Sequence, residues 1–245
     1  MKKNNRLVKI FCSYFSQFIT RCVIFLICLA LYIAARVKGV DDPFLKAPGN
    51  MIFWGIIWVI FMAEMLFRFL PTNILGIGCK KLFRRLFKPT EKTKPHMSTS
   101  PWRVLLLAVI WIIANGLIGA LYLLHIIDAG MLVLLSLLYS IGDLVCVLFF
   151  CPFRDWFLKN RCCADCVIYN WDYPMMFTPL IFIPHPYTWS LAGVSLILLV
   201  LWETAKVVHP ERFAENTNAA ISCKYCKHKP CKHAKRLAKR YRRKA

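Results

Sequence analysis

Long uninterrupted runs of apolar residues limit the folds open to this chain. The runs at 103–124 and 131–151 contain few charged side chains, and each is near the length of about 20 residues that a helix needs to cross about 30 Å of hydrocarbon. Similar runs lie at 15–36 and 51–70. Their apolar residues are continuous, whereas a membrane β-barrel shows alternation. With 58% hydrophobic residues, against about 45–50% in soluble domains, the chain is predicted to be an all-α polytopic membrane protein.

The last apolar block, 167–202, is interrupted by the tripeptide Pro184-His185-Pro186. Proline removes a helical hydrogen bond and clashes with the preceding turn, so this tripeptide should not lie within a helix. The two legs, 167–183 and 187–202, contain 17 and 16 residues, or about 25 Å of helix each. We predict a short, proline-broken helical hairpin here. The full set of six predicted membrane segments is then 15–36, 51–70, 103–124, 131–151, 167–183 and 187–202.

Basic residues set the predicted orientation. The 78–103 connection carries eight Lys and Arg residues, and the tail from Lys206 to Lys244 carries 13. Lys and Arg gather in cytoplasmic loops, so we expect both the N and C termini to be cytoplasmic. In the alternative, 167–202 crosses once and leaves the basic tail outside. The membrane in question would be the cytoplasmic membrane, inner or plasma.

The formal charge of +21 comes from 33 Lys and Arg against 12 Asp and Glu. In a soluble protein this excess would point to nucleic acid, but membrane orientation accounts for it here, and we do not expect nucleic acid as a partner. Anionic lipid headgroups are the expected partners of two basic segments, 79–88 and 232–245. In 79–88 apolar residues recur between basic ones, which predicts an amphipathic segment on the membrane surface. The N-terminal apolar run could also be read as a signal peptide, but the spans that follow favour an uncleaved first span.

Three regions follow from these patterns. Residues 1–14 form a basic cytoplasmic tail and interfacial lead-in, residues 15–203 form the transmembrane helical domain, and residues 204–245 form a basic tail rich in Cys and His.

Two clusters of cysteines carry the strongest chemical signal. The first contains Cys162, Cys163 and Cys166, and the second contains Cys223, Cys226 and Cys231 with His228 and His233. Each contains a C-x-x-C pair, whose two thiolates can bind one metal ion from a single turn. The predicted hairpin brings both clusters to the cytoplasmic face, where reducing conditions disfavour disulfides. We therefore expect a shared metal site with zinc as the cofactor, or an iron–sulfur cluster as the alternative; redox-active thiols and separate clusters are further alternatives.

Polar residues inside the predicted spans form a second group of candidates. They are Glu64, Arg68, Asn115 and Asp143, with Arg21 nearer the end of the first span. Ionisable groups at such depth are costly and point to a substrate, proton or ion path, and the alternative is a structural polar core. Glu64 and Arg68 are spaced to pair along one helix. Residues just after the first cysteine cluster and at the hairpin tip are candidates for a site entrance: Asn170, Trp171, Asp172 and His185.

Three functions fit these features. The first is metal- or thiol-dependent redox chemistry or metal handling at the cysteine clusters. The second is a small transporter that uses Glu64 and Asp143. The third is a non-catalytic membrane scaffold with a structural zinc and a lipid-binding tail. The chain has no phosphate-binding glycine loop and no hydrolase motif, so the sequence leaves open whether it is an enzyme.

Overall fold

The computed structural model describes residues 2–39, 50–70, 77–90, 94–96, 100–158, 166, 168–214 and 216–221. Within these ranges the chain forms helices and turns without a β-strand, apart from an isolated antiparallel bridge between Pro89 and Asn218. The elements in order are α1 (Lys2–Val37), α2 (Asn50–Arg68), α3 (Ile77–Leu82), η1 (Arg84–Leu86), α4 (Pro101–Leu123), α5 (Ala129–Leu148), η2 (Phe153–Leu158), α6 (Ile168–Phe177), η4 (Thr178–Phe182), α7 (Pro186–Val208) and α8 (Pro210–Phe213).

Four of the described helices are long and apolar enough to cross a membrane. They are Tyr14–Val37 within α1, Pro101–Leu123, Ala129–Leu148 and Pro186–Val208. These four match the predicted spans at 15–36, 103–124, 131–151 and 187–202 to within a few residues. The predicted segment at 51–70 is the 19-residue helix α2, and the leg at 167–183 is α6 followed by η4. The prediction of a helical membrane protein is confirmed at this level.

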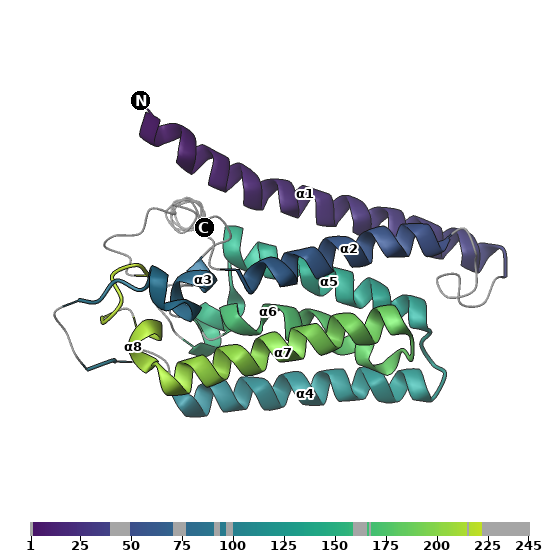
Figure 1. Ribbon diagram of the computed structural model, residues 1–245. Helices are drawn as coiled ribbons and strands as arrows, with labels where there is room; N and C mark the ends of the chain where they lie inside the picture. Colours follow the sequence, from purple (N-terminus) through teal and green to yellow (C-terminus); the bar gives the residue numbers. More distant parts are fainter. Residues whose placement is uncertain are drawn as a thin grey trace, which may run out of the picture.

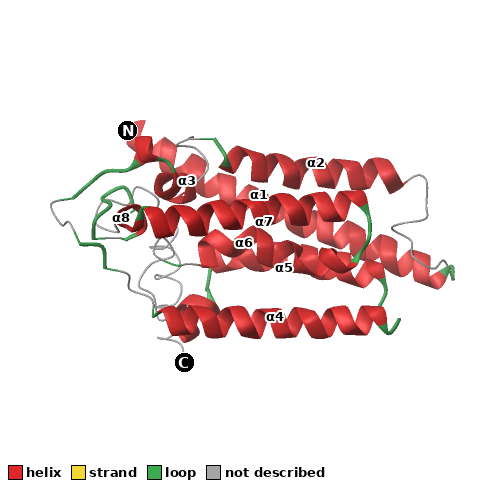
Figure 2. Cartoon of the chain, turned by 60° about the horizontal axis from the view of Figure 1, so that its bottom comes forward, coloured by secondary structure: helices red, strands yellow, loops and turns green. Residues whose placement is uncertain are grey.

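The long helices form a bundle in which α1 lies along one side (Figures 1 and 2). α1 packs antiparallel to α5, as two contacts show. The ring centroids of Phe18 and Phe149 are 5.8 Å apart near one end, and the Tyr32 hydroxyl donates to Asp128 at 2.9 Å near the other. α2 and α7 run in the same direction, with the Trp58 indole donating to the Ser190 hydroxyl at 2.8 Å. The start of α1 and the end of α7 therefore lie at the same end of the bundle (Figure 1).

The block 167–202 does turn back, as the Pro-His-Pro break predicts. The Trp171 indole at the start of α6 donates to Glu203 near the end of α7 at 2.8 Å, and the Trp189 indole near the start of α7 donates to the Ile181 carbonyl at 3.1 Å. Both contacts require α6 and η4 to run antiparallel to α7. His185 begins the return by accepting a hydrogen bond from the Tyr187 backbone N–H at 3.3 Å, ahead of Pro186 in the first turn, where a missing N–H costs nothing.

Prolines also explain why the first leg changes its helix type. Pro174 lies inside α6, and the helix tightens to the 3-10 form from Thr178, next to Pro179. Because proline has no backbone N–H, it interrupts the α-helical bonding pattern. The Thr178 hydroxyl donates to the Pro174 carbonyl at 2.7 Å and satisfies an acceptor there.

The segment 79–88 does not form one continuous helix. α3 ends at Leu82, Phe83 takes an extended backbone conformation, and η1 follows. This region packs against the chain after α8: the Ala219 N–H donates to the Lys88 carbonyl at 2.8 Å, and the Thr90 N–H donates to the Thr217 carbonyl at 3.1 Å. The 80–90 segment is thereby joined to the segment that leads into the C-terminal tail.

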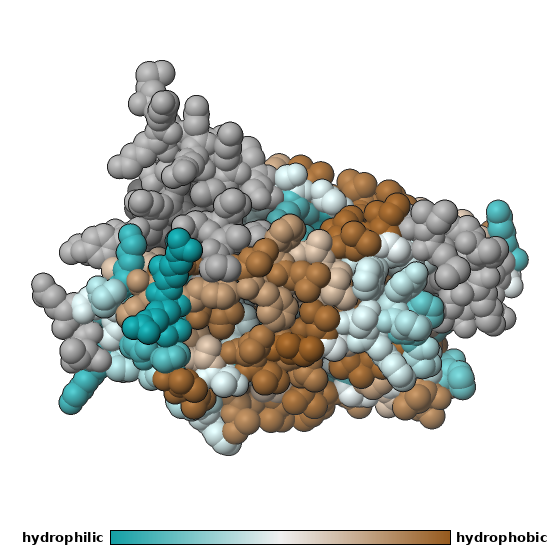
Figure 3. Space-filling model, in the orientation of Figure 1, coloured by the Kyte–Doolittle hydropathy of each residue, from teal (hydrophilic) through white to brown (hydrophobic). Residues whose placement is uncertain are grey.

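Apolar side chains cover much of the outside of the bundle. In the face shown in Figure 3, they form a band across the middle, with hydrophilic residues toward the ends. Exposed members on α1, α4 and α7 include Leu26, Ile112, Ile113, Leu117, Leu196, Ile197 and Val200. An exposed apolar area of this extent is rare on a soluble monomer and is what lipid contact requires.

Candidate functional site

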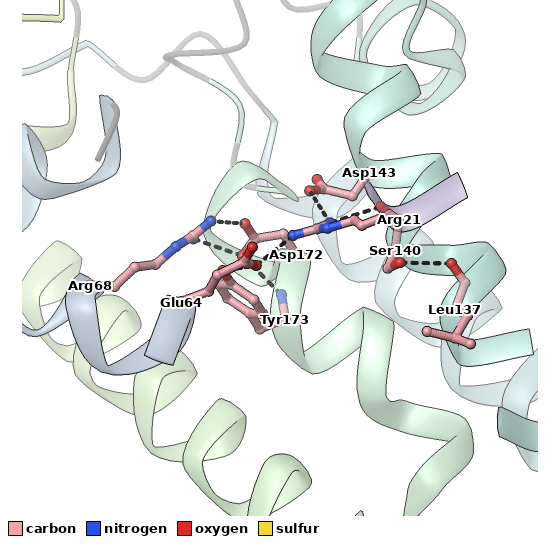
Figure 4. A network of polar contacts seen from close by, with 8 residues as sticks. All are labelled: Arg21, Glu64, Arg68, Leu137, Ser140, Asp143, Asp172 and Tyr173. Atoms are coloured by element: carbon pink, nitrogen blue, oxygen red, sulfur yellow. Dashed lines mark hydrogen bonds and ion pairs between the residues drawn. The ribbon is translucent and has the colours of Figure 1, made fainter. Parts of the chain in front are cut away.

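A network of charged and polar side chains connects four helices inside the bundle (Figure 4). Its members are Arg21 from α1, Glu64 and Arg68 from α2, Ser140 and Asp143 from α5, and Asp172 and Tyr173 from α6. These residues lie as much as 152 positions apart in the sequence, from 21 to 173. Only the packing of the four helices brings them together.

Arg21 lies at the centre of this network and is only 6% exposed. Its Nη2 donates to Glu64 Oε2 at 2.7 Å, and its Nη1 donates to the Ser140 backbone carbonyl at 2.9 Å. A guanidinium has several donors in a fixed plane, so one side chain can bond to α2 and α5 at once. Arg21 therefore ties three helices together.

Arg68, the last residue of α2, forms a two-point contact with the carboxylate of Asp172. Its Nη1 donates to Oδ1 at 3.0 Å, and its Nη2 donates to Oδ2. The guanidinium also lies over the ring of Tyr173, 4.4 Å from the centroid. Such planar pairing is among the stronger charge-assisted contacts in proteins.

Tyr173 connects the two ion pairs. Its hydroxyl is 3.3 Å from Glu64 Oε2 and donates to it, while its ring faces Arg68. Glu64 is thus bonded to both Arg21 and Tyr173, and the Arg21–Glu64 and Arg68–Asp172 pairs form one continuous group.

The predicted pairing of Glu64 with Arg68 along α2 is wrong. Each residue binds a partner on another helix instead, Glu64 with Arg21 and Arg68 with Asp172. A pair within α2 would leave Asp172 buried without its Arg68 counter-charge and would leave Arg21 with only the longer contact to Asp143, and a buried charge that loses its partner is costly.

Asp143 is the most weakly paired carboxylate of the group. Its Oδ2 lies 3.8 Å from Arg21 Nη1, beyond hydrogen-bond distance. Asp143 is also within electrostatic range of Glu64, Arg68 and Asp172. The network contains three carboxylates and two guanidiniums, so with every group ionised it has a formal charge of −1.

Apart from Asp172, the other predicted polar positions lie outside this network. Asn115 is buried in α4, where its Nδ2 donates to the Trp111 carbonyl at 3.0 Å. Asn170 and Asp172 are 4% and 7% exposed, so these two residues are interior groups. Trp171 bonds to Glu203, and His185 caps the start of α7. Of the four residues predicted to form an entrance, three are consecutive at the start of α6 and His185 lies at the hairpin tip, so they do not surround one opening.

Sequence reasoning underrated Arg21 and missed Ser140 and Tyr173. The signal for Arg21 is a single basic residue with apolar residues on both sides, as in FITRCVIF. Ser140 takes part through its backbone carbonyl, which no side-chain pattern reveals. Only the packing shows that Tyr173 is 4% exposed and lies beside the charges.

A cavity of about 130 Å³ lies next to the network, between α2, α5, the α6–η4 leg and α7. Its wall nearest the network contains Phe61 and Phe177, whose rings meet edge to face with centroids 5.4 Å apart. Arg21 lies behind this wall, 5.5 Å from the Phe61 centroid, and Tyr173 stacks on Phe177. Two aromatic rings thus separate an apolar cavity from a charged cluster.

Most of the predicted metal ligands lie outside the described residues: Cys162, Cys163, Cys223, Cys226, Cys231, His228 and His233. Cys166 is described and is buried at 4% exposure. Across the described ranges, no three His, Cys, Asp or Glu side chains are arranged to bind a metal ion.

No protein-family model, curated protein or solved structure matches this chain.

Proposed function

We propose that this chain is a small membrane transporter in which the buried ionic network carries a proton. The observation behind the proposal is the unequal count of three carboxylates and two guanidiniums among helices built for a membrane. A net charge within a bilayer is costly. A proton bound at this network would cancel the formal charge, and its release would restore it.

Asp143 is the carboxylate assigned to this proton. Its guanidinium contact is the longest of the three, at 3.8 Å, whereas Glu64 accepts two hydrogen bonds and Asp172 receives two from Arg68. Arg21 Nε is buried and makes no hydrogen bond to the described residues, so this part of the network retains an unused donor. Protonation of Asp143 would weaken one Arg21 contact, and Arg21 links α1, α2 and α5.

The proposed topology has six membrane segments, with both termini on the cytoplasmic face. The antiparallel return of α6–η4 and α7 supports it, as do the eight basic residues of 78–103 and the 13 of the C-terminal tail. The network would then lie nearer the cytoplasmic end, since Arg68 ends α2 there, and the cavity would lie toward the opposite end.

Proton flux into sealed vesicles tests this function. The purified protein is reconstituted with a pH-sensitive dye inside, a pH gradient is imposed, and its decay is followed. Asp143→Asn and Glu64→Gln should reduce the decay to the rate of empty vesicles. Asp155→Asn is the matched control, because Asp155 pairs with Arg154 outside the network at 2.9 Å. Equal decay in wild type and Asp143→Asn would reject the proposal.

A cytosolic metal site is the second candidate function. One observation favours it: the hairpin returns α7 to the end of the bundle at which α6 begins, so Cys166 and the segment 216–221 lie at the same end. Cys162, Cys163 and Cys166 could then join Cys223, Cys226, Cys231, His228 and His233 around zinc, or around an iron–sulfur cluster. Such a site would serve redox chemistry or metal handling. As a structural zinc site, it would instead hold the C-terminal tail in place in a non-catalytic membrane scaffold.

Metal analysis separates this candidate from the transporter. Purified protein with a shared site should contain about one zinc ion per chain, or iron with sulfide and a visible absorption band. Cys166→Ser combined with Cys226→Ser should release the metal, while Cys22→Ser within α1 should not. Protein without stoichiometric metal when purified under reducing conditions would reject the shared site.

A further inference from the structure

We propose that the cavity between α2, α5, α7 and the α6–η4 leg is a binding site for a small, neutral, single-ring aromatic molecule. The described lining consists of Trp54, Ile57, Trp58, Phe61, Ala129, Val133, Ser136, Leu137, Phe177, Leu180, Ile183, His185, Tyr187, Thr188 and Leu191. Six of these side chains carry rings. The identification of this ligand as the substrate of the transporter rests on the proposed function. The binding site itself is argued from the cavity alone.

The size of the cavity sets the size of the ligand. Its volume is about 130 Å³, and an apolar engineered cavity of about 150 Å³ stays dry and binds benzene. A ligand of one aromatic ring fits such a space. The wall rings Phe61 and Phe177 are arranged edge to face, the geometry in which a further ring packs favourably.

Three polar side chains of the lining make hydrogen bonds within the protein. Ser136 Oγ donates to the Met176 carbonyl at 2.8 Å, and Thr188 Oγ1 donates to the Ile183 carbonyl at 2.7 Å. The Trp58 indole N–H is bonded to Ser190 at 2.8 Å. A ligand in the interior of the cavity would meet carbon surfaces, which favours an apolar molecule over one that needs hydrogen-bond partners.

Charge selects against a cation. Arg21 lies behind the inner wall, with its guanidinium 5.5 Å from the Phe61 centroid. A cation on the cavity side of this ring would compete with Arg21 for the same π-system and would face its positive charge. No Asp, Glu, Lys or Arg belongs to the described lining, so a neutral molecule is the best match.

The position of the cavity indicates that its ligand is a free molecule and not the acyl chain of a lipid. Trp54, Ala129 and Tyr187 all lie within the first five residues of their helices, so the cavity reaches the end of the bundle where these helices begin. The described lining comes from α2, α5, the α6–η4 leg and α7, and α1 and α4 contribute none. Entry is therefore expected from that end, whereas a lipid chain would enter through the side of the bundle.

Fluorobenzene is the probe for this site. It is titrated into the full chain in lipid nanodiscs and followed by ¹⁹F NMR, with empty nanodiscs as the partitioning background. A saturable component is expected in wild type. Ile57→Trp, which places an indole in the cavity, should weaken it at least about tenfold. Ile56→Trp is the matched control, because Ile56 is the adjacent residue of α2 and is 56% exposed on its outer face, so it should bind within about twofold of wild type.

A second pair of variants covers the case in which Ile57→Trp does not fold. Leu137 lines the cavity, and its neighbour Leu138 on α5 is 49% exposed, so Leu137→Trp should lose the saturable component and Leu138→Trp should keep it. Purely non-saturable uptake in wild type would overturn the proposal, as would equal binding by all the folded variants.

Brominated lipid distinguishes the two sources of an apolar ligand. In nanodiscs with dibrominated acyl chains, bromine should quench the fluorescence of Trp58 only a little. The fraction of the total tryptophan emission that is quenched should therefore be nearly the same in Trp58→Phe as in wild type. A quenched fraction that falls clearly in Trp58→Phe would place a lipid chain in the cavity and overturn the assignment of a free molecule. Asp143→Asn should keep fluorobenzene binding, so a failure of the proton-carrier proposal and a failure of this site give different results.

Discussion

Arg21 of α1 and Glu64 of α2 are 2.7 Å apart between Nη2 and Oε2, in an ion pair that joins the first two long helices. The same guanidinium binds α5 through the Ser140 carbonyl at 2.9 Å. The relative positions of three helices therefore depend on one arginine, and this makes Arg21 the first residue to test.

Arg21→Met is expected to destabilise the protein by about 3–5 kcal/mol, because it removes a buried guanidinium and leaves the half-buried Glu64 without its cation beside Asp143. Chemical or thermal unfolding in detergent measures the loss. The double variant Arg21→Met with Glu64→Met should recover a large part of it, since both charges are then removed. A double variant less stable than Arg21→Met would contradict this account of the pair.

Arg36→Met provides the matched control. Arg36 lies on the same helix and pairs with Asp128 at 3.4 Å, but its side chain is 51% exposed. Exposed pairs contribute about 0–1 kcal/mol, so the change in stability should be small. Losses of similar size in the two variants would mean that burial of Arg21 is not the cause.

Gly119→Ala should destabilise the contact between α4 and the hairpin. A Cβ atom at position 119 would lie 2.2 Å from Phe182 Cζ, so the ring must move or the helices must separate. We expect a cost of about 1–3 kcal/mol, measured by unfolding in detergent. Adding Phe182→Leu to Gly119→Ala should reduce this cost.

Gly116→Ala tests the same substitution one turn away on α4. A Cβ atom there meets nothing within 4 Å, so the variant should be neutral or gain up to about 1 kcal/mol from alanine's better helix propensity. Equal destabilisation by the two substitutions would show that the ring of Phe182 is not responsible.

Asp128→Ala should remove the cap of α5 and a link to α1 together. The Asp128 carboxylate accepts from the Met131 N–H at 2.8 Å and from the Tyr32 hydroxyl at 2.9 Å. Loss of a helix N-cap alone costs about 0.5–2 kcal/mol, so a drop of at least about 1 kcal/mol is expected in an unfolding titration. Asp128→Asn keeps an accepting oxygen and should lose less; the reverse order of stability would count against the capping role.

Cysteine labelling tests the proposed topology. Pro186 is exposed at the hairpin tip, and Val208 is exposed at the opposite end of α7. In intact cells a membrane-impermeant maleimide should label Pro186→Cys and should label Val208→Cys only after permeabilisation, with wild type as the background. Labelling of Val208→Cys in intact cells would reject a cytoplasmic end for α7.

Local patterns were sufficient to predict the long apolar helices. Continuous apolar runs leave the backbone no partner but itself in a bilayer, so each run must be helical, and the four candidate spans follow. Pro184 and Pro186 likewise lack the N–H that a continuing helix needs, so the turn between η4 and α7 could be located from the sequence. The split of 79–88 at Phe83 could not, because it depends on contacts of this region with α8 and the chain after it, such as the bond from Arg212 of α8 to the Leu82 carbonyl at 3.3 Å.

The candidate site was predictable only as a set of residues. Glu64, Arg68 and Asp143 stand out because ionisable groups are rare in apolar runs, and that rarity can be read without a structure. Their partners cannot, since i to i+4 spacing allowed Glu64 to bind Arg68 and no sequence pattern favours Arg21 instead.

The sequence by itself determined that this chain forms apolar helices, that its last apolar block breaks at Pro184–Pro186, and that a few charges lie within the helices. Only the tertiary structure decided that Arg21 binds Glu64, that Arg68 binds Asp172, and that aromatic rings separate these pairs from a cavity. The physical reason is one of range. Helix formation and proline breaks depend on hydrogen bonds between residues a few positions apart, whereas a buried charge is stabilised by whichever opposite charge the packing brings within about 3 Å.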